Sequence, residues 1–312
     1  MRLKITHITR YLYPGLASDS HNELRLMPVT DESQVCLDFR LDVRPYARMF
    51  AYDLPCGRVH HFNLREPHAA LAIRAESLVV THERDAFASL QLVEDDFGFY
   101  KRDYVRRKNW EYLAPTARVP LDPETDRIAA VATRQAGPST ASFLVALTRL
   151  LHRVMDYAPG TTHVNTPLRE VLENQRGVCQ DFSHLMLAVC RRREIPCRYV
   201  SGYIYTRNAE DAEGTSGNML DQNASQWHDV NDEIVQTSTL IGGDAMHAWV
   251  ECLMPDGTWH GFDPTNNLVV DSHYVKVHSG RDYSDVTPVK GLFHGSANQT
   301  METAVAVVKE SI

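Results

Sequence analysis

The chain has 312 residues, of which 43% are hydrophobic, so it is long enough for one large domain or two ordinary ones. Its 32 lysines and arginines against 40 acidic residues give a net charge of −8, which argues against a nucleic-acid-binding protein because such proteins usually carry a basic patch. No polybasic run, signal-peptide pattern or bilayer-length apolar run occurs, so we expect a soluble, cytoplasmic protein without a membrane partner.

Residues 1–85 have the pattern of a β-rich domain. Short β-prone runs alternate with turn signals: LKITHITRYLY, CLDFRLDVRP, RMFAYDLPCGRVHHFNL and ALAIRAESLVVTH. From Cys36 to Leu41 polar and apolar residues alternate, and this period of two indicates a half-buried strand. Antiparallel strands joined by turns such as DLPCG predict a small β-sandwich-like domain.

Residues 86–120 are mixed and charged and are interpreted as a connector, and helical patterns begin at residue 121. The predicted helices are DPETDRIAAVATRQ, SFLVALTRLLHRVMDY and TPLREVLENQRG, the last with Thr166 as N-cap, Pro167 at its first position and Gly177 at its end. The strands RYVSGYIYT, AMHAWVECL, TWHGFDP and HYVKVHS follow, and then the apolar run TAVAVVK. Helices followed by antiparallel strands predict an α+β core over residues 121–312.

A long connection, residues 207–243, separates two of these strands and is rich in acidic residues. Compact domains rarely hold so long a loop without a functional reason. One hypothesis is that the connection borders a cleft and favours cationic or amine-bearing substrates. The alternative is a disordered insertion.

The stretch GVCQDFSHL begins a further helix. Phe182, Leu185, Met186 and Val189 lie on one helical face, and Pro196 prevents continuation, so the helix is expected over about 179–193 with Cys179 at its start. A helix N-terminus stabilises a thiolate. The charge of Asp181 opposes that thiolate, so we expect this carboxylate to be held by hydrogen bonds instead.

The chain has six cysteines, and their spacing separates Cys179 from the others. Zinc sites need closely spaced ligand pairs, and the spacings between Cys179, Cys190 and Cys197 are eleven and seven residues. Disulfides are rare in the cytosol. The other five cysteines are therefore interpreted as free and structural: Cys36, Cys56, Cys190, Cys197 and Cys252. Cys179 alone remains open between core residue and nucleophile.

A predicted hairpin supplies a base and its orienter. A three-residue loop at 255–257 pairs 254 with 258 and 247 with 265, and a slip of one pair puts His247 opposite Asp263. In either register the two share one face of the sheet, as diagonal neighbours about 7–8 Å apart or as direct neighbours. An imidazole held by a carboxylate is the arrangement that activates a thiol. The alternative is a solvated strand histidine and a turn aspartate.

Three blocks in this order resemble the bacterial transglutaminase-like family: GVCQDFSHLMLAVCRRREIPCRYVSGY, HAWVECLMPDGTWHGFDPTN and SGRDYSDVTPVKG. The β-rich start is similar to the N-terminal region that accompanies this core in bacteria. The resemblance implies a papain-like core with Cys179, His247 and Asp263 as a catalytic triad. It implies a thiol-dependent amidohydrolase or peptidase that acts on a peptide or amide, with an acyl transferase as the alternative. It implies no metal or cofactor.

Several points stay open from sequence. The Cys179 amide is the expected oxyanion donor, and Gln175 and Tyr157 are weak candidates for a second one. Arg281 and Asp282 of GRDYSDV are expected to brace the core rather than touch substrate. A non-catalytic peptide-binding module is a further alternative, and a homo-oligomer is compatible with the sequence.

Overall fold

The computed structural model describes residues 1–83, 86–91, 97–136, 139–206, 245–295 and 298–310. Among these, the N-terminal strands form one curled antiparallel sheet organised around β1 (Arg2–Leu24). The first half of β1 pairs with β5 and β14, and its last residues pair with β4 and β13. The strands that join it are β2 (Gln34–Arg44), β3 (Phe50–Leu54), β4 (Gly57–Leu64), β5 (His68–Thr81), β13 (Val289–His294) and β14 (Thr300–Lys309).

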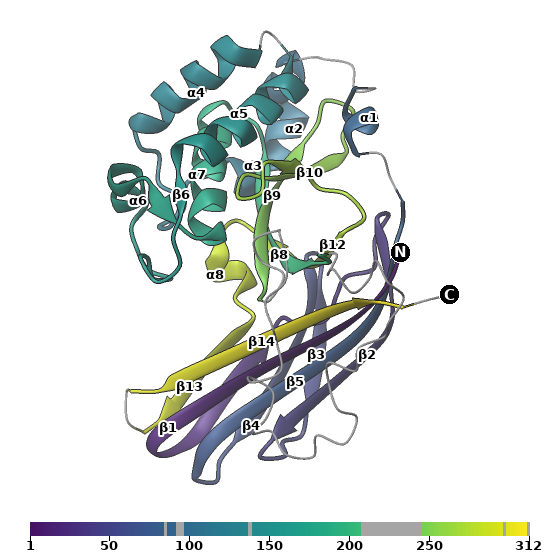
Figure 1. The fold of residues 1–312 in the computed structure, drawn as a ribbon, viewed down its shortest axis with the longest axis vertical. Helices are drawn as coiled ribbons and strands as arrows, with labels where there is room; N and C mark the ends of the chain where they lie inside the picture. Colours follow the sequence, from purple (N-terminus) through teal and green to yellow (C-terminus); the bar gives the residue numbers. More distant parts are fainter. Residues whose placement is uncertain (84–85, 92–96, 137–138, 207–244, 296–297, 311–312) are drawn as a thin grey trace.

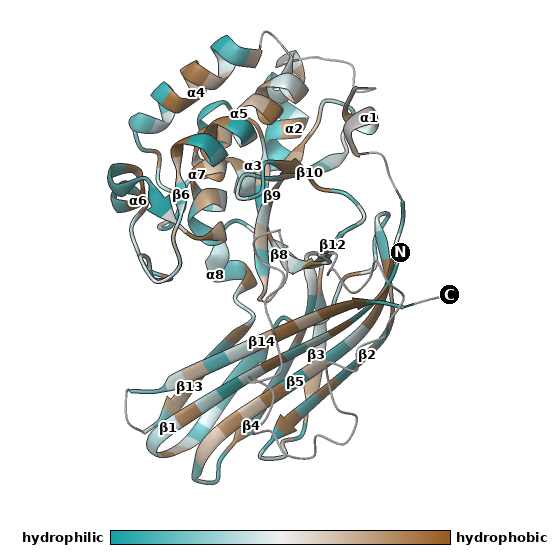
Figure 2. Ribbon diagram, viewed as in Figure 1, coloured by the Kyte–Doolittle hydropathy of each residue, from teal (hydrophilic) through white to brown (hydrophobic). Residues whose placement is uncertain are grey.

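The two halves of this sheet share a core because their strands alternate in polarity. Phe62 and Leu64 of β4 pack in one buried cluster with Leu71 and Ile73 of β5. Figure 2 shows hydrophobic and hydrophilic segments alternating along the long strands, as expected when one face of a sheet is buried. The predicted α+β class with a β-sandwich-like start is therefore confirmed.

The second sheet carries the residues of the candidate site. Its strand order is β11-β10-β9-β8-β12, and all its pairings within the described residues are antiparallel. The strands are β8 (Cys197–Ile204), β9 (His247–Leu253), β10 (Trp259–Asp263), β11 (Leu268–Val269) and β12 (Tyr274–Gly280). Every residue of β9 is buried: helices cover one face of the sheet (Figure 1), and on β9 Trp249 packs in a separate buried cluster with Val200, Ile204 and Tyr274.

The helices of this core pack around α7 (Cys179–Arg192), whose residues are almost all buried. The other helical segments are α1 (Ala86–Gln91), η1 (Phe97–Lys101), α2 (Asp103–Lys108), α3 (Trp110–Leu113), α4 (Glu124–Ala136), α5 (Thr140–Val154), α6 (Leu168–Asn174) and α8 (Tyr283–Val286). Two short strands, β6 (Asp156–Tyr157) and β7 (Arg176–Gly177), pair in parallel. No helix in the described part of the chain is long and apolar enough to cross a membrane.

The predicted limits of the core differ from the structure at both ends. The C-terminal strands β13 and β14 belong to the N-terminal sheet, where they pair with β1 (Figure 1). The segment expected to be a connector, 86–120, packs on the core through Val105 and Val119, which are fully buried. Both differences arise because tertiary packing across a long sequence separation leaves no local pattern.

The start and end of α6 also differ from expectation. Pro167 is the N-cap residue, and the Thr166 hydroxyl accepts a hydrogen bond from the His163 amide at 2.8 Å. The helix ends at Asn174, because Gln175 adopts the left-handed conformation with φ 53°. Gly177 was predicted to end the helix, and it lies instead in β7.

A buried charge network joins the two sheets. The carboxylate of Glu251 on β9 lies 2.7 Å from Arg198 Nε and 2.7 Å from Lys276 Nζ. Lys276, on β12, also reaches Asp31 of the N-terminal domain at 2.9 Å. The amide side chain of Gln34 hydrogen-bonds to both the backbone N–H and the carbonyl of Lys276. The N-terminal domain therefore contacts β12 directly through hydrogen bonds and an ion pair.

We expect Glu251→Ala to lower the free energy of unfolding by about 3–5 kcal/mol, because it leaves two largely buried cations, Arg198 and Lys276, without their shared counter-ion. Chemical denaturation at neutral pH measures this. Glu124→Ala is the matched control, since the Glu124–Arg127 pair is exposed, and its cost is expected to be about 0–1 kcal/mol. Equal losses of unfolding free energy in the two variants would show that the buried network contributes no more to stability than an exposed ion pair.

Candidate active site

Cys179 is the first residue of α7, as predicted. Val178 precedes it in an extended conformation, and the carboxylate of Asp181 accepts a hydrogen bond from the Val178 amide at 2.8 Å. No hydrogen bond within the described part of the chain engages the Cys179 amide. The half-buried thiol and this amide therefore share the positive end of a well-anchored helix.

Asp181 is a brace at the helix start, as expected. It is buried, and its Oδ2 also accepts a hydrogen bond from the Thr162 hydroxyl at 2.7 Å. Burial raises the pKa of this carboxyl above its ordinary value. A Cβ on Gly177 would lie 2.5 Å from Asp181 Oδ2, so glycine is required there by the brace.

His247 and Asp263 share one face of the sheet because of the hairpin register. Leu253 pairs with Trp259 and Val250 with Phe262, which is the register of the three-residue loop. His247 and Asp263 are consequently diagonal neighbours, and His247 Nε2 lies 2.8 Å from Asp263 Oδ2. Both side chains are fully buried.

Besides His247, four other donors hydrogen-bond to the carboxylate of Asp263. Its Oδ2 also accepts from the Tyr274 hydroxyl and from the Asn266 side-chain amide, each at 2.8 Å. Its Oδ1 accepts from the backbone amides of Thr265 and Asn266 at 2.9 and 3.2 Å. Burial favours the neutral acid, but His247 and these donors outweigh it and hold the pKa of Asp263 below its usual value.

The imidazole of His247 is poised to carry a proton. Burial opposes the charged form, but the charge and hydrogen bond of Asp263, together with Cys179, outweigh it and raise the pKa of His247 from 6.5 to about 10. With Nε2 bound to Asp263, the other ring nitrogen, Nδ1, has no hydrogen-bond partner among the described residues. The imidazole thus has one nitrogen anchored by Asp263, one buried nitrogen without a partner in the described structure, and the Cys179 thiol as a neighbour.

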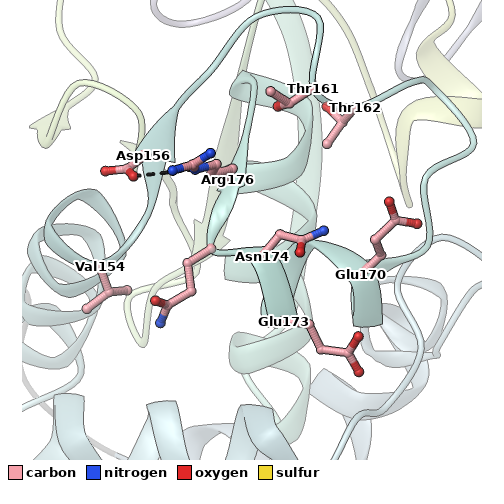
Figure 3. A pocket seen from close by; sticks show the side chains of 9 residues that line it. Val154, Asp156, Thr161, Thr162, Glu170, Glu173, Asn174 and Arg176 are labelled. Carbon is pink, nitrogen blue, oxygen red and sulfur yellow. Dashed lines mark ion pairs between the residues drawn. The ribbon is translucent and has the colours of Figure 1, made fainter.

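The two weak oxyanion candidates lie at the short β6–β7 sheet, which precedes α7. Gln175 lines an open pocket of about 630 Å³ beside the short β6–β7 sheet, where Asp156 and Arg176 face each other (Figure 3). The lining of this pocket does not include Cys179, His247 or Asp263. Tyr157 is half-exposed and pairs in β6 with Gly177. Gly177 lies two residues before Cys179, so Tyr157 is held close to the start of α7, and the role of either residue as an oxyanion donor stays a prediction.

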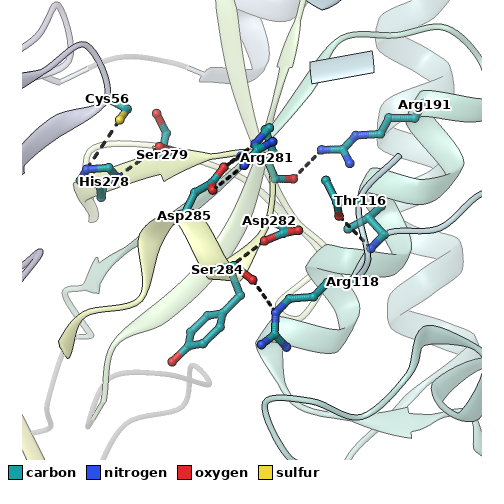
Figure 4. Close-up of polar contacts among 12 residues, drawn as sticks. Cys56, Thr116, Arg118, Arg191, His278, Ser279, Arg281, Asp282, Ser284 and Asp285 are labelled. Atoms are coloured by element: carbon teal, nitrogen blue, oxygen red, sulfur yellow. Dashed lines mark hydrogen bonds and ion pairs between the residues drawn. The ribbon is translucent and has the colours of Figure 1, made fainter. Parts of the chain in front are cut away.

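The GRDYSDV segment braces the core, as expected. Arg281 makes a two-pronged ion pair with Asp285 at 2.8 and 3.0 Å, and its carbonyl accepts from Arg191 (Figure 4). Asp282 is buried and caps α8 through the Ser284 amide at 2.7 Å. The acidic connection 207–243 lies outside the described residues.

The remaining cysteines are free, as predicted. Cys190, Cys197 and Cys252 are fully buried in the core, and the Cys190 and Cys252 sulfurs are 3.9 Å apart. Burial raises the pKa of Cys252 above its ordinary value. Cys36 and Cys56 are half-buried, and Cys56 lies 3.6 Å from His278 (Figure 4).

Sequence reasoning missed the other groups around Asp263. Asn266 had a local signal, because a residue three positions after an aspartate can complete an Asx-type turn. Tyr274 had none, since it comes from β12, two strands away from β9. Trp249 lies on β9 with its ring 5.3 Å from that of Tyr274 and stacks beside His247.

Comparison with known proteins assigns a family to the core and to the N-terminal part of the chain. Residues 126–264 match the model of the transglutaminase-like superfamily core, and residues 3–80 match that of the bacterial transglutaminase-like N-terminal region. An uncharacterised protein of Mycobacterium leprae is 33% identical over 99% of both chains. An uncharacterised protein of Mycobacterium tuberculosis is 28% identical over 98% of this chain and 92% of the relative.

The fold has a solved counterpart. A crystal structure from Cytophaga hutchinsonii, named as a candidate cysteine protease, has a TM-score of 0.69 at 22% identity and covers 100% of this chain and 92% of that one. At this identity the likeness establishes the fold.

Tyr274→Phe tests whether this hydroxyl holds Asp263. We expect a loss of about 1–3 kcal/mol in the free energy of unfolding, because a buried carboxylate loses a hydrogen-bond donor. A double-mutant cycle with Asp263→Asn is expected to show a coupling of about 0.5–3 kcal/mol. Tyr203→Phe is the control, since its hydroxyl pairs with His7 at 2.9 Å, and it should be additive with Asp263→Asn. Additivity for Tyr274 as well would contradict the assigned contact.

Proposed function

Because the chain belongs to the transglutaminase-like superfamily, we propose that it is a thiol-dependent amidohydrolase or peptidase. In this proposal Cys179 is the nucleophile, His247 the acid and base, and Asp263 the residue that orients and charges the histidine. The observation that carries it is the state of His247: Nε2 is bound to Asp263 at 2.8 Å, Nδ1 is buried without a hydrogen-bond partner among the described residues, and Cys179 acts on the ring.

The first half of the reaction forms a thioester. The Cys179 thiolate attacks the amide carbonyl carbon, a C–S bond forms, and the oxygen takes the negative charge. The Cys179 backbone N–H, at the positive end of α7, is the donor that this oxyanion would meet. The C–N bond then breaks while the His247 imidazolium transfers its proton to the leaving amine.

The second half releases the acyl group. Neutral His247 takes a proton from water, the water oxygen attacks the thioester carbonyl, and the C–S bond breaks. The products are a carboxylic acid and the regenerated thiolate–imidazolium pair. A primary amine in place of water would give a new amide, so acyl transfer is the second candidate and uses the same residues.

Turnover of a peptide and amide library, followed by mass spectrometry with and without a primary amine, separates these outcomes. Free acid supports hydrolysis, and an amine conjugate supports acyl transfer. We expect Cys179→Ala to abolish both. Cys252→Ala is the matched control, because Cys252 is a buried cysteine on β9, the strand that carries His247. Binding of peptides without turnover, unchanged in Cys179→Ala, would favour a non-catalytic module and overturn the proposal.

The pH dependence follows from the sign of the His247 shift. The imidazolium that protonates the leaving amine is present below its raised pKa of about 10 and is lost as the pH rises through that value. Asp263→Asn removes the main group that raises this pKa, so burial is then opposed only by Cys179. We expect the alkaline limb of the thioester-forming rate, at about 10 in the native protein, to move to lower pH in the variant. An alkaline limb that stays in place would show that His247 is not the proton donor.

A further inference from the structure

A tight turn after α3 presents one arginine at the edge of the core. The amide of Thr116 donates to the Val119 carbonyl at 3.1 Å, and the Val119 amide donates to the Thr116 hydroxyl at 3.0 Å. Val119 is fully buried and anchors the turn. Arg118, between these two residues, is half-buried and points away from the anchor toward α8 (Figure 4).

The guanidinium of Arg118 is held by neutral groups. Its Nε donates to the Ser284 hydroxyl at 2.7 Å, and its Nη2 donates to the Asn165 side-chain oxygen at 2.8 Å. The guanidinium also lies over the ring of Tyr283, 5.7 Å from its centroid. These three contacts hold the long Arg118 side chain in one rotamer, and this ordering costs conformational entropy.

No carboxylate in the described part of the chain forms an ion pair with Arg118. The neighbouring carboxylate of Asp282 accepts from the Ser284 amide at 2.7 Å instead (Figure 4). A guanidinium has five N–H donors arranged as a fork that matches a carboxylate. The contacts of Arg118 with Ser284 and Asn165 use its Nε and Nη2, and no hydrogen bond from its Nη1 occurs among the described residues.

Two contacts place this guanidinium at the rim of the Cys179 site. Asn165, its hydrogen-bond partner, follows Val164, whose carbonyl accepts from the side chain of Gln180 at 3.4 Å, and Gln180 is the neighbour of Cys179. Tyr283, under the guanidinium, is close enough to feel both charges: burial raises its pKa, Arg118 lowers it and Cys179 raises it. Arg118 and the thiol thus flank the same tyrosine.

We propose that Arg118 is the anion-binding residue of this active site and receives a carboxylate of the substrate close to the amide that Cys179 attacks. The inference rests on the proposed function and names its substrate class, an acidic peptide or amide. The carboxylate can come from an aspartate or glutamate side chain or from a free C-terminus. The hypothesis drawn from the sequence of the acidic connection 207–243 predicts the opposite preference, for cationic substrates.

Two alkylating reagents of nearly equal size test the charge preference without requiring a known substrate. Iodoacetate carries a carboxylate and iodoacetamide is its neutral counterpart, and with each the Cys179 thiolate forms an S–C bond as the C–I bond breaks and iodide leaves. The measurement is the ratio of the two alkylation rates at Cys179, followed by mass spectrometry. We expect Arg118→Gln to lower the iodoacetate-to-iodoacetamide ratio on the order of tenfold.

Three further variants test whether the change in the ratio comes from the Arg118 guanidinium. Arg118→Lys keeps the charge and loses the fork, so its ratio is expected to lie between those of the native protein and Arg118→Gln. Asn165→Ala removes one contact that fixes the guanidinium and is expected to lower the ratio as well. Arg40→Gln removes an exposed arginine of the N-terminal sheet, 77% exposed, and is expected to leave the ratio unchanged.

The outcomes separate this inference from the proposed function. A Cys179 that reacts with neither reagent contradicts the proposed nucleophile. A reactive Cys179 whose ratio is the same in the native protein, Arg118→Gln and Asn165→Ala overturns the role of Arg118 alone. A general loss of structure would also separate His247 from the thiol and change the ratio, so the ratio is compared only among variants that keep the unfolding temperature of the native protein.

Protection of Cys179 against iodoacetamide then identifies the source of the carboxylate. Protection by a C-terminally amidated peptide with an internal glutamate assigns a side chain, and protection by a neutral peptide with a free C-terminus assigns a terminus. Either protection is expected to be lost in Arg118→Gln. Protection by amidated lysine peptides only would overturn the inference in favour of a cationic substrate.

Discussion

The buried carboxylate of Asp263 is the group on which the candidate site depends. A charge taken out of water is tolerated only when its oxygens are fully hydrogen-bonded, and five donors from β9, β12 and the turn after β10 meet this one. The same charge sets the imidazole: it fixes which nitrogen carries the proton toward Asp263 and raises the pKa of His247. Orientation and protonation of the histidine therefore have a single physical origin.

The two sheets act together around this group. Tyr274 is the first residue of β12. Two residues later, Lys276 hydrogen-bonds to Gln34 and forms an ion pair with Asp31, both in the N-terminal domain. A buried apolar cluster joins the same strands, with Leu3 and Ile5 packed against Val275 and Val277. The N-terminal domain thereby supports β12, the strand whose Tyr274 donates to Asp263. Its physical role is to position this strand, although the candidate site itself lies in the other sheet and in α7.

The edge of the site is built by segments that look unremarkable in sequence. The turn that carries Arg118 belongs to a charged stretch, and its partners come from the loop before α6 and from the start of α8. Each contact joins residues far apart in the chain. What they produce together is a fixed guanidinium, with only neutral groups as its hydrogen-bond partners in the described structure, at the rim of a thiol site.

The sequence by itself determined the elements whose signal is local. Cys179 at a helix start follows from apolar spacing and from Pro196, and the shared face of His247 and Asp263 follows from strand parity and a short loop. Tertiary structure alone decided that Tyr274 donates to Asp263, that β13 and β14 complete the N-terminal sheet, and that Arg118 stands beside Tyr283. Periodicity reports which face of an element is buried, whereas the partner across that face depends on packing between distant segments.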